Sequence, residues 1–204
     1  MKTISEYFPH ILLAAYLFVF VWLGIAPYDR AVWYVENAPI FAIAAVLAVL
    51  YLRGIRFSNL SYVLMSVLLF LHTVGGHYTF ERVPFDWFND FFGFERNMYD
   101  RLGHFSVGFY AFPFMELLDR YGVITKRWVA YLFPLFAVAA VAMSYELIEW
   151  IYAAYFGDPG AGAAFLGSQG DIWDAQKDML SDTLGAVFAL VLYGVIRRNP
   201  SLQR

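Results

Sequence analysis

The stretch YVENAPIFAIAAVLAVLYL, residues 34–52, carries one charged side chain, Glu36, and is otherwise neutral and largely apolar. One helical crossing of a bilayer needs about 20 mostly apolar residues. Outward from this stretch, similar runs predict further crossings at residues 9–26, 60–80, 102–118, 128–155 and 179–196. We therefore expect an all-α, polytopic membrane protein, a bundle of about six transmembrane helices that forms a single domain over residues 1–204.

The composition supports this fold class and excludes several functions. Of the 204 residues, 61% are hydrophobic and 15% are charged, which is more apolar than a soluble domain of this length. The net charge of −3 gives no electrostatic support for a nucleic-acid partner. The chain has no cysteine, so disulfides and thiolate metal sites are excluded. Membrane lipids are the partners that this composition predicts.

The positions of Lys and Arg predict the orientation of the bundle, because these residues are enriched on the cytoplasmic side of a membrane. With a cytoplasmic N-terminus, the cytoplasmic segments hold nine of them: Lys2, Arg53, Arg56, Arg120, Lys126, Arg127, Arg197, Arg198 and Arg204. The opposite segments hold five: Arg30, Arg82, Arg96, Arg101 and Lys177. We therefore expect both termini in the cytoplasm.

Two long connections are expected on the outer side. Residues 81–101 combine aromatic and charged side chains, which is typical of an amphipathic segment on a membrane surface and equally compatible with an ordinary packed loop. Residues 156–170 are rich in Gly and Ala, which predicts a flexible connection or lid.

Ionisable side chains of four predicted helices gather at one depth, in the outer leaflet. They come from the end of the third helix, the start of the fourth, the outer half of the fifth and the approach to the sixth: His72, His77, Asp100, Arg101, His104, Glu146, Glu149, Asp171, Asp174, Asp178 and Asp182. Charged groups are expensive in lipid and usually face a bundle interior or a wet cavity. We therefore expect a polar pocket near the outer leaflet.

The spacing of these residues predicts which of them share a helical face. The four aspartates between residues 171 and 182 step by three or four, and so do the two glutamates of the fifth helix. His72 and His77 are five apart, which places them about 140° around a regular helix. The pair Gly75-Gly76 between them is expected to loosen this turn and to bring both imidazoles inward.

Carboxylates this close together repel one another and need a cation, protonation or a basic partner. Neutral imidazole plus carboxylate is a common ligand set for zinc, manganese or iron. The sequence therefore predicts a divalent metal with the candidate ligands His72, His77, His104, Glu149, Asp178 and Asp182. The alternative interpretation is a buried hydrogen-bond network that holds the helices together.

Four strings in chain order resemble a known family. They are HTVGGHY from His72, YDRLGHF from Tyr99, YELIEW from Tyr145 and GDIWDAQKDMLSDT from Gly170. Together they resemble the YjdF family, a group of bacterial inner-membrane proteins without an assigned activity, and the resemblance covers nearly the whole chain. It implies a multi-pass protein of the bacterial inner membrane, but no reaction.

The second half also resembles, more weakly, the VanZ-like family, which is linked to glycopeptide resistance. The matching positions are Asp100, Arg101, His104, Phe105, Glu146, Glu149, Asp174, Asp178, Asp182, Thr183, Leu184 and Gly185. Asp182 stands where Asn is common in that family, and His72 and His77 lie outside the shared region. The resemblance therefore implies no activity for this chain.

The predicted pocket leads to a functional hypothesis. A metal there could lower the pKa of a bound water or polarise a phosphoryl or acyl oxygen, which suits hydrolysis or transfer on an envelope lipid or lipid-linked substrate. In this hypothesis Glu146 is the general base and Arg101 holds an anionic headgroup. The alternatives are an ion-coupled transporter or permease, and a non-catalytic membrane scaffold. Ionisable groups in one leaflet only argue against a transport path.

Overall fold

The computed structural model describes residues 4–156 and 166–198, which form helices and contain no β-strand. The elements are α1 (Ile4–Gly24), α2 (Arg30–Leu52), α3 (Asn59–Tyr78), α4 (Asp86–Phe92), α5 (Tyr99–Val107), the 3₁₀-helix η1 (Gly108–Tyr110), α6 (Ala111–Tyr121), α7 (Arg127–Tyr155) and α9 (Asp174–Arg198). Most of the Gly- and Ala-rich stretch predicted to be flexible lies outside the described residues. The all-α fold class is confirmed.

Five of the described helices are long and apolar enough to cross a membrane, at Tyr7–Gly24, Arg30–Leu52, Asn59–Tyr78, Arg127–Tyr155 and Asp174–Arg198. The sixth pass predicted from the sequence corresponds to α5, η1 and α6, which follow one another without a gap from Tyr99 to Tyr121 and are not among these five spans. This pass includes the helix predicted at residues 102–118. The chain is therefore a polytopic helical membrane protein.

Two glycines explain how closely this sixth pass approaches α9. A Cβ atom on Gly108 would collide with the backbone of Gly185 and Ala186, and a Cβ on Gly185 would collide with the carbonyl of Phe105. Small residues at a helix crossing let two backbones come together in a membrane. Gly108 lies about one helical turn after His104. The close crossing therefore holds α5 against α9 beside the polar residues described below.

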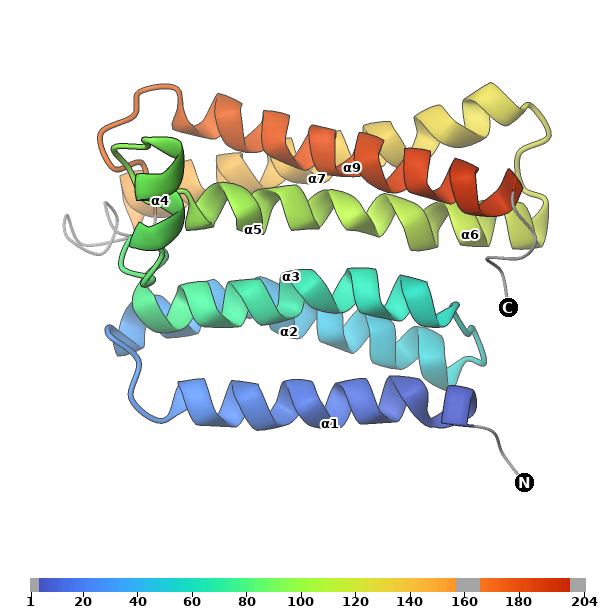
Figure 1. The fold of residues 1–204 in the computed structure, drawn as a ribbon, viewed down its shortest axis with the longest axis horizontal. Coiled ribbons are helices and arrows are strands. Elements are labelled where there is room, and N and C mark those ends of the chain that lie inside the picture. The colour runs from blue at the N-terminus through green and yellow to red at the C-terminus, as the bar shows by residue number, and fades with distance from the viewer. Residues whose placement is uncertain (1–3, 157–165, 199–204) are drawn as a thin grey trace.

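Figure 1 shows two groups of helices that run along the long axis of the molecule. One group contains α1, α2 and α3, and the other contains α5 with α6, α7 and α9. Contacts of α3 with α5, η1 and α6 join the two groups. The short α4 lies across one end, which we call the α4 end, whereas α1 begins and α9 ends at the opposite, terminal end.

Local capping sets where several helices begin. The Asp29 carboxylate accepts hydrogen bonds from the backbone N–H groups of Ala31 and Val32, at 2.8 and 3.0 Å, so α2 begins at Arg30 rather than at residue 34. Ser58 caps α3 in the same way. The last helix, α9, begins at Asp174 rather than at residue 179. This earlier start places Asp174 and Asp178 inside the helix.

Besides a buried apolar core, the bundle exposes large apolar side chains and buries several acidic ones. Large apolar side chains such as Trp22, Leu52 and Phe136 are exposed, whereas Asp178 and Asp182 are 3% and 1% exposed. Apolar surface is stable against lipid, and polar side chains gain from partners inside the bundle. The polar interior therefore marks the functional candidates.

The segment before α5 forms the amphipathic helix α4. Trp87 and Phe91 are 70% and 80% exposed on one face, and Phe85 and Asn89 are buried on the other. The Asn89 side-chain oxygen accepts a hydrogen bond from the backbone N–H of Met98 at 3.1 Å, which ties α4 to the start of α5. Contact of the aromatic face with the membrane surface stays a prediction.

Candidate functional site

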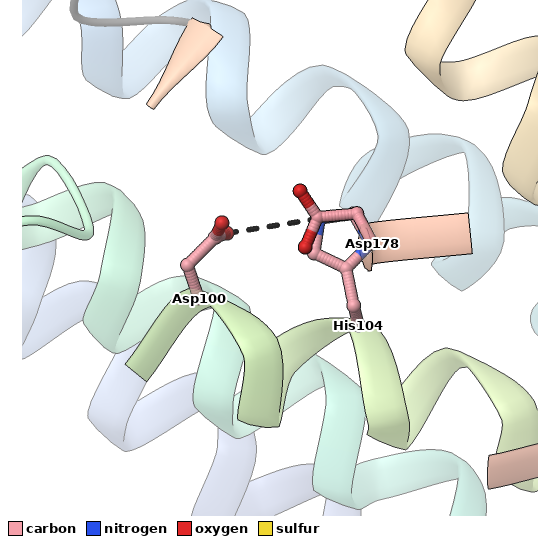
Figure 2. A group of neighbouring side chains, drawn as sticks. All are labelled: Asp100, His104 and Asp178. Atoms are coloured by element: carbon pink, nitrogen blue, oxygen red, sulfur yellow. Dashed lines mark ion pairs between the residues drawn. The ribbon is translucent and has the colours of Figure 1, made fainter. Parts of the chain in front are cut away.

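His104 on α5 lies among three carboxylates near the α4 end, two of which appear with it in Figure 2. Its Nδ1 atom is 3.3 Å from Asp182 Oδ2. Its Nε2 atom is 3.7 Å from Asp100 Oδ1 and 3.6 Å from Asp178 Oδ1. The ligand atoms of Asp100, His104 and Asp178 all lie within 4.8 Å of one another. The i,i+4 spacings on α5 and on α9 bring these four residues together.

The buried Arg101 and the half-buried Arg96 compensate the neighbouring aspartates. Arg101 is 2.5 Å from Asp174 Oδ1 and also forms an ion pair with Asp178. Arg96 forms an ion pair with Asp174 and lies 3.7 Å from Asp100. Bonds between charged donors and acceptors are the strong ones, particularly away from water. The two guanidinium groups therefore hold the start of α9 against the start of α5.

Asp171 lies just before α9 and adds a further negative charge to this region. Lys177 Nζ donates a hydrogen bond to its Oδ2 at 2.6 Å, and the Trp173 N–H donates to its Oδ1 at 3.1 Å. The hydrogen bond from Lys177, and then that from Trp173, lowers the pKa of Asp171 below its ordinary value. Asp171 is therefore ionised at neutral pH, 3.6 Å from both Arg96 and Arg101.

A cavity of about 280 Å³ opens beside His104, between the two groups of helices. Its polar lining residues are Glu36, His72, Asp100, His104, Tyr145, Glu149 and Asp182. Its apolar lining includes Ile40, Ile43, Leu68, Phe80, Val107 and Val141. On α2, α3, α5 and α7 alike, the polar residues lie nearer the α4 end than the apolar residues of the same helix. The polar lining residues therefore gather toward the α4 end, where Phe80 and Leu166 also line the cavity, and the other end is apolar.

Several polar atoms around this cavity are buried without a hydrogen-bond partner. They include Tyr145 Oη, Glu146 Oε1 and Asp182 Oδ1. A buried polar atom without a partner costs about 1–3 kcal/mol. Tyr145 and Asp182 also line the cavity, so two of these unpartnered atoms belong to residues of the cavity wall.

The two predicted histidines of α3 point to different places. His72 lines the cavity, with Nε2 2.8 Å from the Glu36 backbone oxygen and 3.4 Å from Glu36 Oε2. His77 instead bonds through Nδ1 to the Leu23 backbone oxygen at 2.7 Å, and it does not line the cavity. The structure therefore does not bring His77 to the other candidate ligands.

The expected loosening of α3 at Gly75-Gly76 does not occur, because the helix continues to Tyr78. A Cβ on Gly75 would collide with the ring of Phe80, and a Cβ on Gly76 would crowd Glu36. These glycines make room for neighbouring side chains and leave the 140° offset between the histidines unchanged.

The two predicted catalytic residues also lie differently from expectation. The Arg101 guanidinium is engaged by Asp174 and Asp178 and does not line the cavity. Glu146 lies on α7 beside the acid–histidine cluster, where His104 and Asp178 are its strongest charged influences, but it is not among the residues that line the cavity. Of the two α7 glutamates, Glu149 is the one at the cavity wall.

Some site residues were missed because the sequence gave them another explanation. Glu36, the one charged side chain in residues 34–52, is not among the predicted site residues, yet it is 4% exposed and lines the cavity. Asp100 was placed in the polar cluster but not among the metal ligands. Arg96 was assigned to a surface loop, although its i,i+4 spacing to Asp100 was a usable signal.

A second set of acidic residues lies at the terminal end. Glu116 accepts hydrogen bonds from the Ser58 hydroxyl at 2.9 Å and the Ser61 hydroxyl at 2.5 Å, and it pairs with Arg120 at 2.5 Å. Asp119 accepts a hydrogen bond from the Tyr193 hydroxyl at 2.7 Å. Neither carboxylate lines the cavity beside His104.

These observations define the class: a polytopic α-helical membrane protein with an acid–histidine cluster beside an internal cavity. The chain belongs to the family described as "Predicted membrane protein (DUF2238)", which matches residues 8–199.

Among curated proteins, the chain is 36% identical over 176 residues to "Inner membrane protein YjdF" of Escherichia coli (strain K12), which covers 85% of this chain and 82% of that protein. The resemblance to the YjdF family is confirmed, and with it a multi-pass protein of the inner membrane. The resemblance to the VanZ-like family stays a prediction. No solved structure matches the chain significantly.

Proposed function

We propose that the protein binds a divalent cation between Asp100, His104 and Asp178 and uses it to act on an envelope lipid or lipid-linked substrate. The observation that carries this proposal is the spacing around His104 Nε2, which is 3.7 Å from Asp100 Oδ1 and 3.6 Å from Asp178 Oδ1. These distances are too long for hydrogen bonds. They suit atoms that share one metal ion at about 2.0–2.2 Å each.

Asp182 fits a supporting role in such a site. Its Oδ2 faces His104 Nδ1 at 3.3 Å, on the opposite side of the ring from Nε2. Metal-bound histidines usually donate their second N–H to a carboxylate, which fixes the tautomer and the ring orientation. We therefore assign Asp182 to positioning His104, in place of the direct ligand role that the sequence suggested.

The charge balance also favours a cation. Carboxylates around the cluster outnumber the permanent cations near them, which are Arg96, Arg101 and Lys177. The carboxylates are Glu36, Asp100, Glu146, Glu149, Asp171, Asp174, Asp178 and Asp182. A divalent ion would offset part of this excess where it is densest. A site with two carboxylates and one imidazole suits manganese, iron or zinc, and the oxygen majority favours manganese.

The cavity shape supports a lipid as the substrate. Its polar end would hold the reacting group near the cation, and its apolar end would hold hydrocarbon. The metal would supply Lewis acidity or an activated water. Glu149, at the cavity wall, is placed to accept a proton, and Arg101 holds Asp178 in position. With the α4 end outside, as the Lys and Arg positions predict, the substrate would come from the outer leaflet.

The transporter alternative has less support from the same geometry. A transport path needs polar groups that continue toward the other side of the membrane. At the terminal end, Glu116 and Asp119 are held by serine, tyrosine and arginine side chains outside the cavity. A scaffold alternative predicts that the cluster binds no metal.

Metal analysis of the purified protein tests the proposal. We expect close to one manganese or zinc per chain after mild dialysis, and a raised melting temperature when metal is added, because a ligand that binds the folded state stabilises it. Asp100→Asn should lose this metal while the protein still inserts and purifies, since the ion pairs of Asp100 in the cluster are long, at 3.7–3.9 Å.

Two surface variants, Asp86→Asn and Asp90→Asn, are the matched controls and should keep the metal, because both side chains are exposed on α4. A metal-free wild-type protein whose melting temperature ignores manganese, zinc, iron and magnesium would contradict the proposal. It would leave the hydrogen-bond network as the role of the cluster.

A further inference from the structure

A second cavity, of about 370 Å³, is an open groove between α2 and α6, on the terminal side of the polar cavity. Its walls are apolar, with Leu47 of α2 and Phe114 of α6 among the lining residues. The hydroxyl of Tyr110, which also lines it, donates to the Met65 backbone oxygen at 3.1 Å. The lining side chains therefore suit hydrocarbon and offer little to a polar ligand.

The two cavities adjoin in the middle of α2. Ala42 and Ile43 line both of them. The combined surface follows α2 from Glu36 at the polar end to Leu50 at the apolar end. At 1.5 Å per residue this stretch of helix is about 21 Å long, which exceeds half of the roughly 30 Å hydrocarbon core. The surface is thus longer than one leaflet.

The far end of the second cavity is formed by an aromatic side chain. Phe57, which precedes α3, lines the cavity and packs against Tyr62 with the ring centres 5.9 Å apart. The polar groups of the combined surface lie at the opposite end, around His104 and Glu36. A molecule that fills both cavities therefore has its polar part at the α4 end and its hydrocarbon end near Phe57.

We propose that the second cavity binds the hydrocarbon chain of the substrate, a lipid with a phosphate headgroup and one long chain that lies along α2. This inference rests on the proposed function, because the carboxylates around His104 would repel a phosphate without the cation between them. The groove between α2 and α6 selects for chain length, and the cation binds the headgroup.

Photolabelling of the full-length protein in detergent with manganese tests this inference. The probes are hexadecyl phosphate and octyl phosphate, each with a diazirine at the end of the alkyl chain, and hexadecyl alcohol with the same diazirine. The hexadecyl phosphate should label residues around Leu47, Phe114 and Leu117, at the apolar end. The octyl phosphate should label residues near Ala42 and Ile43, where the cavities adjoin.

Val46 and Val49 provide a matched pair of variants on α2. Both are exposed, at 58% and 53%, but only Val46 is among the residues that line the second cavity. Val46→Trp should reduce groove labelling by hexadecyl phosphate at least about fivefold, because a larger side chain overfills the occupied space. Val49→Trp should leave the labelling unchanged. Retention of metal by Val46→Trp shows that this variant is folded.

Each outcome decides one of the two claims. Equal labelling of the Val46→Trp and Val49→Trp variants, or labelling spread over lipid-facing residues such as Trp22, would overturn the chain-binding groove while leaving metal binding intact. Groove labelling by hexadecyl phosphate that survives both chelation and Asp100→Asn would support the groove and contradict the headgroup role of the metal. If chelation abolishes labelling by hexadecyl phosphate and leaves labelling by hexadecyl alcohol unchanged, both the chain-binding groove and the headgroup role of the metal are supported.

Discussion

The two ends of the bundle use similar residue types for different arrangements. At the terminal end, Glu116 and Asp119 bind serine and tyrosine hydroxyls and arginines. At the α4 end, His104 Nε2 faces two carboxylates beyond hydrogen-bond distance, and Asp182 Oδ1 is buried without a partner. The first arrangement is closed, whereas the second has a buried oxygen without a partner in a residue that lines a cavity.

This difference teaches how to separate a structural cluster from a binding site in a membrane protein. Acidic residues alone do not distinguish the two ends. The distinguishing features are the distances between ligand atoms, the unpartnered buried oxygen and the adjoining cavity. A hydrogen-bonded network has its lowest energy when every buried polar atom has a partner, so the deficit at Asp182 shows that the cluster is not a completed hydrogen-bond network within the described residues.

The largest expected contrast in stability concerns one arginine at each end. Arg101→Met removes the arginine partner of the buried Asp178 and leaves Asp174 with Arg96 alone, and it should destabilise the protein by about 3–5 kcal/mol. Arg120→Met removes a half-exposed partner of Glu116, which keeps its serine hydrogen bonds, and should cost only about 0–1 kcal/mol. Thermal unfolding of both variants in the same detergent measures the contrast. Equal losses of stability would show that the α4 end is no more sensitive to charge balance than the terminal end.

A smaller effect is expected from pH at the edge of the site. The Lys177 hydrogen bond lowers the pKa of Asp171, so this interaction stabilises the fold above the ordinary carboxyl range and is lost as the pH falls through the lowered pKa. Lys177→Gln should therefore reduce the melting temperature slightly at pH 6, and the difference should shrink as the pH is lowered below the ordinary carboxyl range near 4. Lys126→Gln, at the terminal end, is the control. A Lys177→Gln effect that persists unchanged in acid would rule out Asp171 as its cause.

Much of the fold could be predicted from the sequence, because apolar runs long enough to span a bilayer are strong signals. The grouping of polar residues of α3, α5, α7 and α9 at one end followed from helix direction alone. The predicted start of α9, at residue 179, is too late, because the stretch from Asp174 is polar and lacks the apolar residues of a membrane-spanning helix. In the structure its aspartates have buried arginine partners, so polar residues could extend the helix.

The details of the site depended on contacts that spacing does not give. The sequence selected His77 as a ligand by its residue type, but the regular helix of α3 turns it toward the Leu23 carbonyl. It assigned Arg101 to a headgroup, but the aspartates of α9 reach this guanidinium first. Glu36 and Tyr145 enter the site through the packing of helices that are distant in sequence.

The central claim is that a metal ion lies against His104, and the magnetic coupling between bound manganese and the imidazole nitrogen tests it most directly. Protein containing ¹⁵N-histidine is loaded with Mn²⁺ and measured by pulsed electron paramagnetic resonance. We predict a nitrogen coupling in the wild-type protein that is lost in His104→Gln and kept in His77→Gln, because His77 lies away from the cavity. The absence of bound manganese, or a coupling that persists in His104→Gln, would contradict the account.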